Sequence, residues 1–213
     1  MNGGRGRFIT LEGGEGAGKS SQLGLLADAL RKAGHAVVAT REPGGTPGAE
    51  VIRTLLVNGE AGRWDPMSEL LLFAAARHEH VRQKIAPALA RGEWVLCDRF
   101  ADSTMAYQGY GHGLGREPCE TAHKLALGDF QPDLTFILDL PVEDSLKRAA
   151  GRGNAATRYE RMAIEFHRRV REGFLEIARR EPERCCVIDA SGPLPGVQTA
   201  IRRAAAERLG VAI

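Results

Sequence analysis

The chain has no long apolar run and little excess charge, and each absence argues against a class of protein. Its 213 residues carry a formal net charge of only +2. So small an excess argues against a broad surface for nucleic acid or membranes. No segment reaches the roughly 20 apolar residues of a transmembrane helix, and residues 1–7 lack the apolar stretch of a signal peptide. We therefore expect a cytoplasmic protein that binds neither nucleic acid nor a membrane.

The cysteines are few and do not form a metal-binding pattern. None is spaced as C-x-x-C or paired with histidine as in a zinc site, so we expect reduced, buried thiols. These residues are Cys97, Cys119, Cys185 and Cys186.

Short apolar runs alternate with helix-like segments, and this order predicts a doubly wound α/β fold. The runs are bounded by polar or turn residues, as buried parallel strands are. The expected strands are Phe8–Glu12, His35–Thr40, Trp94–Asp98, Leu134–Leu140 and Cys185–Asp189. The expected helices are Ser21–Lys32, Met67–Arg91, Val142–Ala150, Met162–Arg180 and Val197–Leu209, while Gly109–Gly115 and Gly151–Asn154 are expected to be loops. We expect one domain over residues 1–213, with a five-stranded parallel sheet and helices on both faces.

The segment Gly13–Ser20 matches the phosphate-binding pattern G-x-x-x-x-G-K-[ST] and follows the first expected strand. Its glycines allow a nest of backbone N–H donors, and the N-terminus of the next helix also attracts anions. Lys19 is expected to reach the β and γ phosphates, and Ser20 to ligate Mg²⁺. The pattern predicts a P-loop NTPase fold that binds ATP. The expected ATP-binding residues are Gly13, Gly14, Glu15, Gly16, Ala17, Gly18, Lys19 and Ser20.

Charged residues follow the next strands at the edge of the sheet where such folds bind ligands. Asp98 ends the third expected strand, where it could hold Mg²⁺ or, alternatively, cap the next helix. Arg41 and Arg99 leave the same edge, although a surface ion pair is an alternative for Arg99. Two arginines exceed the needs of ATP alone, so we expect a second, anionic substrate.

Several separated motifs resemble those of bacterial thymidylate kinases, which are nucleoside-monophosphate kinases. They are Gly13–Ser20, Thr40–Thr46, Asp98–Phe100, Ser103–Gly109 and Leu127–Asp133, in the order found in that family. The resemblance covers nearly the whole chain. It implies transfer of the γ-phosphoryl group of ATP to dTMP, giving dTDP and ADP for dTTP synthesis, with Mg²⁺ as cofactor. It also implies a homodimer formed by packed helices.

The resemblance assigns the base-binding residues. Phe73 and Arg77 are four residues apart and share one helix face. In the family, the matching residues stack on thymine and hydrogen-bond a thymine carbonyl. Without the resemblance, Phe73 would be assigned to the core and Arg77 to a solvated face. Thr104 and Gln108 fall where the family reads the base edge, and Tyr107 falls near the deoxyribose.

The resemblance also assigns the residues around the acceptor phosphate and sugar. Arg99, with help from Arg41 and Arg53, would hold the dTMP phosphate. A carboxylate within an anion-binding loop is otherwise unexpected, and the family uses the residue matching Glu15 near the 3′-hydroxyl of dTMP. Ser103 belongs to the same substrate-binding motif.

In-line phosphoryl transfer requires no covalent intermediate, because a phosphate oxygen of the acceptor is already nucleophilic. Catalysis then consists of positioning and charge neutralisation. Loop positions 14–17 carry no basic residue, so we expect this charge from the basic, glycine-hinged segment 147–159, which resembles a mobile lid. Arg152, with Arg158 second, is expected to be an arginine finger; a solvated charged loop is the alternative. The expected catalytic residues are Lys19, Asp98, Arg99, Arg152 and Arg158.

Other functions remain open at this point. A different small kinase, such as a deoxynucleoside kinase, would share the scaffold and differ in the base pocket. A switch ATPase would share the phosphate loop, but Arg41 and Arg99 argue for a second phosphate site. A guanine-reading G protein is disfavoured because no N-K-x-D motif occurs. His112 stands where related sequences have Arg, which argues against a phosphate contact there.

Overall fold

A five-stranded parallel sheet forms the centre of the structure, a computed structural model that describes residues 6–60, 62–151 and 157–213. Its strands are β1 (Phe8–Gly13), β2 (Val37–Arg41), β3 (Trp94–Asp98), β4 (Leu134–Asp139) and β5 (Cys185–Asp189). They lie in the order β2-β3-β1-β4-β5, and every neighbouring pair is parallel. The predicted sheet is confirmed, with strand bounds that agree to within two residues.

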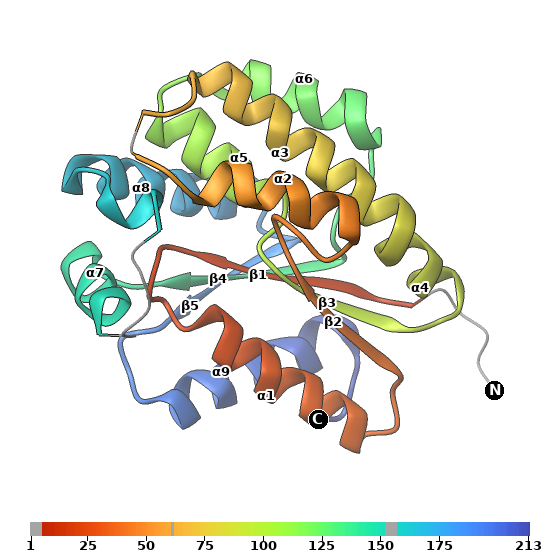
Figure 1. Cartoon of the computed structure of the whole chain (residues 1–213). Coiled ribbons are helices and arrows are strands. Elements are labelled where there is room, and N and C mark those ends of the chain that lie inside the picture. The colour runs from red at the N-terminus through yellow and green to blue at the C-terminus, as the bar shows by residue number, and fades with distance from the viewer. Residues whose placement is uncertain (1–5, 61, 152–156) are drawn as a thin grey trace.

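Helices cover both faces of the sheet (Figure 1). One face carries α1 (Lys19–Lys32) and α9 (Leu194–Leu209). The other face carries α2 (Pro47–Val57), α3 (Pro66–His80), α4 (Ala86–Ala90), α5 (Ala101–Thr104), α6 (Arg116–Leu127) and α8 (Ile164–Arg180), while α7 (Val142–Ala150) lies at one end. Two π-helical segments, η1 (Val81–Ile85) and η2 (Met105–Gly111), and the 3₁₀ turn η3 (Tyr159–Arg161) complete the described elements. No helix of the described residues is long and apolar enough to cross a membrane.

The core follows the hydrophobic periodicity of the sequence. All six residues of β1 are buried, and the polar Thr10 and Glu12 are buried with their apolar neighbours. Leu23, Leu26 and Leu30 of α1 recur at helical spacing and pack against β1 and α9. The sheet is therefore held on both faces, and its carboxyl edge is fixed in position for the loops that follow the strands.

Some helices differ from their predicted extents. The predicted helix Met67–Arg91 is continuous in direction but is divided into α3, η1 and α4, and the predicted loop Gly109–Gly115 is helical as far as Gly111. The helix α2 had not been assigned, although Thr46 caps it and Pro47 stands at its first turn. The cysteines are free thiols, three of them buried and Cys186 partly exposed.

Candidate active site

The phosphate loop lies in the turn between β1 and α1. Gly13, Gly16 and Gly18 have positive φ angles of 135°, 74° and 90°, which side chains disfavour. A Cβ atom at Gly16 would lie 2.2 Å from the carbonyl oxygen of Ser145 in α7. Both the backbone conformation and this close approach therefore require glycine, and the loop backbone is held against α7.

Lys19 is buried within the loop. Its Nζ donates to the carbonyl oxygens of Gly13 at 3.2 Å and Gly14 at 2.7 Å. Burial and, to a smaller extent, the nearby charge of Arg99 lower the pKa of Lys19 to about 8. Because a bound polyphosphate would favour the charged form, the ammonium group is placed to respond to an anion.

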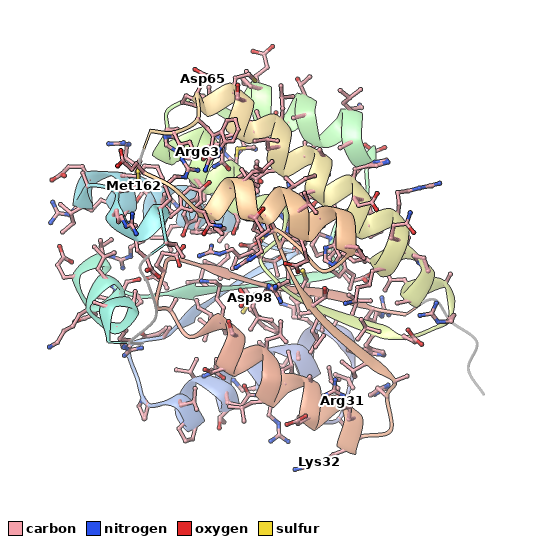
Figure 2. The ribbon with its side chains drawn as sticks, viewed as in Figure 1. Arg31, Lys32, Arg63, Asp65, Asp98 and Met162 are labelled. Carbon is pink, nitrogen blue, oxygen red and sulfur yellow. The ribbon has the colours of Figure 1, made fainter. Side chains whose placement is uncertain are left out.

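Ser20 and Asp98 provide the oxygen atoms of a possible Mg²⁺ site. The Ser20 hydroxyl donates to a carboxylate oxygen of Asp98, which stands at the end of β3 near the middle of the view in Figure 2. Mg²⁺ prefers oxygen ligands and usually retains water and substrate phosphates, so two protein oxygens suffice. Among the described residues, no group of three or more His, Cys, Asp or Glu side chains could hold a metal ion. The residues therefore suit Mg²⁺ held together with a nucleotide.

A cavity of about 220 Å³ opens beside the loop at the carboxyl edge of the sheet. It brings together most of the predicted site residues: Glu15, Lys19, Ser20, Arg41, Arg53, Phe73, Asp98, Arg99, Ser103, Thr104, Tyr107 and Gln108. Its lining also includes residues that the sequence analysis missed: Glu42, Pro43, Val57, Thr157, Tyr159 and Glu160. The side chains thus come from segments far apart in the chain, as a site formed by the loops after several strands requires.

Arg99 is held at the junction between the phosphate loop and this cavity. Its φ of 71° is unusual for a residue with a side chain, and its backbone N–H donates to Leu11 at 3.0 Å. The guanidinium donates to the Gly13 carbonyl at 2.9 Å and to Glu15 at 2.8 Å. It also donates to the Tyr107 hydroxyl at 3.0 Å. A permanent positive charge is therefore fixed beside the loop, within the cavity wall.

Glu12 is a buried acid that the sequence analysis did not single out. Its carboxylate accepts from the Phe100 N–H at 2.7 Å and from the Ser103 hydroxyl at 2.5 Å. Burial, followed by the nearby charge of Asp102, raises the pKa of Glu12 to about 8. An acid at the buried end of an apolar strand, directly before the phosphate loop, was the available signal.

Arg41 and Arg53 line the more open side of the cavity. Arg41 is about half exposed and pairs with both carboxylate oxygens of Glu50 at 3.0 Å. Arg53 donates to the carbonyl oxygen of Pro43 at 2.8 Å, and the peptide bond before Pro43 is cis. Both guanidinium groups face the same cavity as Arg99 and could meet a second phosphate.

The predicted base-binding residues occupy two layers. Phe73, Thr104 and Gln108 line the cavity, whereas Arg77 lies behind it and is only 4% exposed. Arg77 donates from Nε to Glu42 at 2.7 Å and from Nη2 to the Thr104 hydroxyl at 2.8 Å. Its assignment to a solvated face from helix spacing alone is wrong, because a buried carboxylate compensates its charge.

The arginines of the predicted lid differ in what the structure describes. Arg152 lies outside the described residues, so its assignment as an arginine finger stays a prediction. Arg158 is 1% exposed and donates to Glu69, to the Leu56 carbonyl at 3.1 Å and to the Tyr159 hydroxyl at 2.9 Å. These bonds hold its guanidinium between α2 and α3, which argues against a mobile catalytic role for Arg158.

The chain is similar to a known protein family over most of its length. The family model for thymidylate kinase matches residues 11–201. The chain belongs to the thymidylate kinase family. It is 56% identical over 207 residues to the thymidylate kinase of Caulobacter vibrioides, covering 97% of this chain and 99% of the relative. It is also 54% identical over 210 residues to the thymidylate kinase of Rhodopseudomonas palustris strain TIE-1, covering 96% and 90% respectively.

A solved structure supports the same family assignment. The crystal structure of thymidylate kinase from Ehrlichia chaffeensis superposes with a TM-score of 0.75 at 38% identity, covering 94% of this chain and 98% of that one. Two predictions from the motifs are thus confirmed: the resemblance to the thymidylate kinase family, and the P-loop NTPase fold.

Proposed function

We propose that this chain transfers the γ-phosphoryl group of ATP to dTMP, giving dTDP and ADP for dTTP synthesis. Membership of the thymidylate kinase family supports this activity. The observation that carries it is a single cavity lined by Lys19 of the phosphate loop, by Arg99 and by the aromatic ring of Phe73. One cavity thus offers a site for a polyphosphate, a site for a second phosphate and a surface on which a base can stack.

In the proposed reaction, the phosphate loop binds ATP and Lys19 contacts its terminal phosphates. Mg²⁺ held by Ser20 and Asp98 would neutralise part of the charge on those phosphates. Arg99 orients the phosphate of dTMP beside the loop, assisted by Arg41 and Arg53 from the open side of the cavity. An oxygen of that phosphate is then in position to attack the γ-phosphorus in line.

The remaining cavity residues orient the nucleoside of the acceptor. Phe73 is half-buried in the wall and can stack on thymine. Tyr107 and Glu15 are hydrogen-bonded to each other at 3.0 Å beside Arg99. They are therefore placed to contact the deoxyribose next to the acceptor phosphate. Thr104 and Gln108 complete the end of the cavity nearest the base.

The chain is further proposed to act in the cytoplasm as a homodimer through α2 and α3. These helices contact each other and leave apolar side chains on the surface, including Val51 at 64%, Leu55 at 36% and Leu71 at 54% exposure. Exposed apolar side chains on adjoining helices are typical of an interface. Light scattering after gel filtration should give twice the chain mass of 23.0 kDa, and Leu71→Glu should shift it to the monomer mass.

The test of the activity measures ADP release from Mg·ATP with dTMP, dUMP, dCMP, AMP or thymidine as the acceptor. Turnover that strongly favours dTMP supports both the kinase reaction and the thymine site. Turnover that favours another monophosphate or thymidine would retain the scaffold and overturn the base assignment. ADP release that ignores every acceptor would contradict the second phosphate site and favour a switch ATPase.

A further inference from the structure

Glu69 lies on α3, one helical turn before Phe73, and its side chain is fully buried behind the base end of the cavity. Its Oε1 accepts from Gln108 Nε2 at 2.7 Å and lies 3.2 Å from His112 Nε2. Its Oε2 accepts from the buried guanidinium of Arg158. Donors from η2 and from the residue before η3 therefore converge on one carboxylate.

These contacts fix the protonation state of Glu69. Burial raises the pKa of a carboxyl group, but the contacts with His112 and Arg158 outweigh it, and the pKa of Glu69 is lowered. An ionised carboxylate accepts hydrogen bonds and cannot donate them. Gln108 must therefore turn its NH₂ group toward Glu69 and its carbonyl oxygen away from it.

The hydrogen bond to Glu69 also fixes the direction of the carbonyl oxygen of Gln108. Gln108 Oε1 is buried and has no hydrogen-bond partner in residues 6–60, 62–151 and 157–213, and Gln108 lines the cavity. A buried acceptor without a partner costs about 1–3 kcal/mol. A ligand that brings a hydrogen-bond donor to this oxygen would recover that cost.

Thr104 supplies the complementary group. It precedes Gln108 by four residues on the continuous helical segment formed by α5 and η2, and it lines the same cavity. Its hydroxyl oxygen accepts from Arg77, so its own proton can point to a ligand. The wall therefore presents an acceptor from Gln108 beside a donor from Thr104.

We propose that Glu69 is a positioning residue which, by fixing the amide of Gln108, selects bases with an N3–H group next to a carbonyl. Thymine and uracil present N3–H to the Gln108 oxygen and the neighbouring carbonyl to the Thr104 hydroxyl. Cytosine presents the reverse, an acceptor at N3 beside an amino group, and would face a like partner at each position. The inference rests on the proposed function, because it assumes that the acceptor base occupies this end of the cavity.

The test measures kcat/KM for dTMP, for dCMP and for a dTMP analogue in which C–H replaces N3–H. Glu69→Gln keeps the shape of the side chain but adds an NH₂ group, so that Gln108 can turn over. Gln108→Leu removes the amide itself. Glu207→Gln is the control, because it removes one exposed negative charge on α9.

The wild-type chain should prefer dTMP over the C–H analogue by about tenfold or more, which is the loss of one buried hydrogen bond. Glu69→Gln and Gln108→Leu should each reduce two preferences by about tenfold: that for dTMP over the C–H analogue and that for dTMP over dCMP. The change should come mainly through the KM for dTMP. The control should retain both preferences.

The outcomes separate this inference from the proposed function. A wild-type chain that does not phosphorylate dTMP contradicts the function itself. A wild-type chain that discriminates, with both variants discriminating equally well, overturns the role of Glu69. A lower melting temperature in Glu69→Gln with unchanged preferences would mean a purely structural role and also overturn it. If Glu69→Gln does not fold, Gln108→Leu decides, since retained discrimination there excludes readout by the amide.

Discussion

The phosphate loop and the base-binding end of the cavity share one site but are built differently. The loop is made by the backbone of consecutive residues Gly13–Ser20, with Lys19 bonded to the carbonyls of that same loop. The base end is made by side chains from α3, from η2 and from Arg158 before η3, held by the buried carboxylates Glu42 and Glu69. Local backbone shape thus governs one half of the site, and long-range charge pairing governs the other.

This difference predicts different consequences of mutation. Lys19 is proposed to contact the reacting phosphates, so its loss should appear in the rate of transfer. Arg77 and Arg158 are each paired with a buried carboxylate, so their loss should appear in stability or acceptor affinity. The two ends can therefore be distinguished by which measured quantity changes.

The largest effect is expected for Arg152→Ala. If Arg152 is the arginine finger, its removal should reduce kcat by about 10³-fold or more while the KM for dTMP changes little. Steady-state kinetics with saturating ATP would measure both, with Arg179→Ala on the exposed face of α8 as the control. An unchanged kcat would exclude Arg152 as the arginine finger. Lys19 and Arg99 would then be expected to neutralise the charge on the transferring phosphoryl group.

Lys19→Met should have the next largest effect. It removes a buried positive charge that is proposed to contact the transferring phosphoryl group, and kcat should fall by about 10²–10³-fold. Because Lys19 donates only to loop carbonyls among the residues that the structure describes, the thermal unfolding midpoint should change little. A variant with near-normal kcat and a raised KM for ATP alone would instead assign Lys19 to uniform binding.

The phosphate loop could be predicted from the sequence more fully than the base end. The strands and the phosphate loop could be predicted because apolar runs and the spacing of Gly13–Ser20 are local signals. The partners of Glu12 and Glu69 could not, because no local pattern in the sequence indicates which residues a buried acid contacts. These partners lie far along the chain, as in the contact of Glu69 with Arg158, 89 residues away. The burial of Arg158 could not be predicted for the same reason.

Arg158→Met tests whether the base end depends on charge pairing. The substitution leaves the Glu69 carboxylate buried without its guanidinium partner and should lower the free energy of unfolding by about 3–5 kcal/mol. Urea denaturation followed by circular dichroism would measure it. The matched control is Arg168→Met, which breaks an exposed pair with Glu143 and should change the stability little. Equal losses in the two variants would contradict the role of Arg158 as a buried structural partner.

Glu12→Gln should have the smallest effect, and it tests the junction between the two regions. Glu12 directly precedes the phosphate loop, and its partner Ser103 belongs to the helical segment of the base end. Its pKa is about 8 in the folded chain against the ordinary value of about 4.5, so between these pH values the folded chain holds a proton that the unfolded chain releases. The free energy of unfolding should therefore fall as the pH rises through this window, an effect complete above about pH 8 and absent below about pH 4.5.

Glutamine keeps the shape of protonated Glu12 at every pH, so the variant should lose this dependence. Relative to the wild type, its free energy of unfolding should be higher at pH 8.5 than at pH 5. Urea denaturation at the two pH values measures this difference. A difference that does not change with pH would show that Glu12 is ionised in the folded chain. Glu12 would then be a buried ionised carboxylate like Glu69. A buried charge would therefore help to hold the phosphate loop as well as the base end.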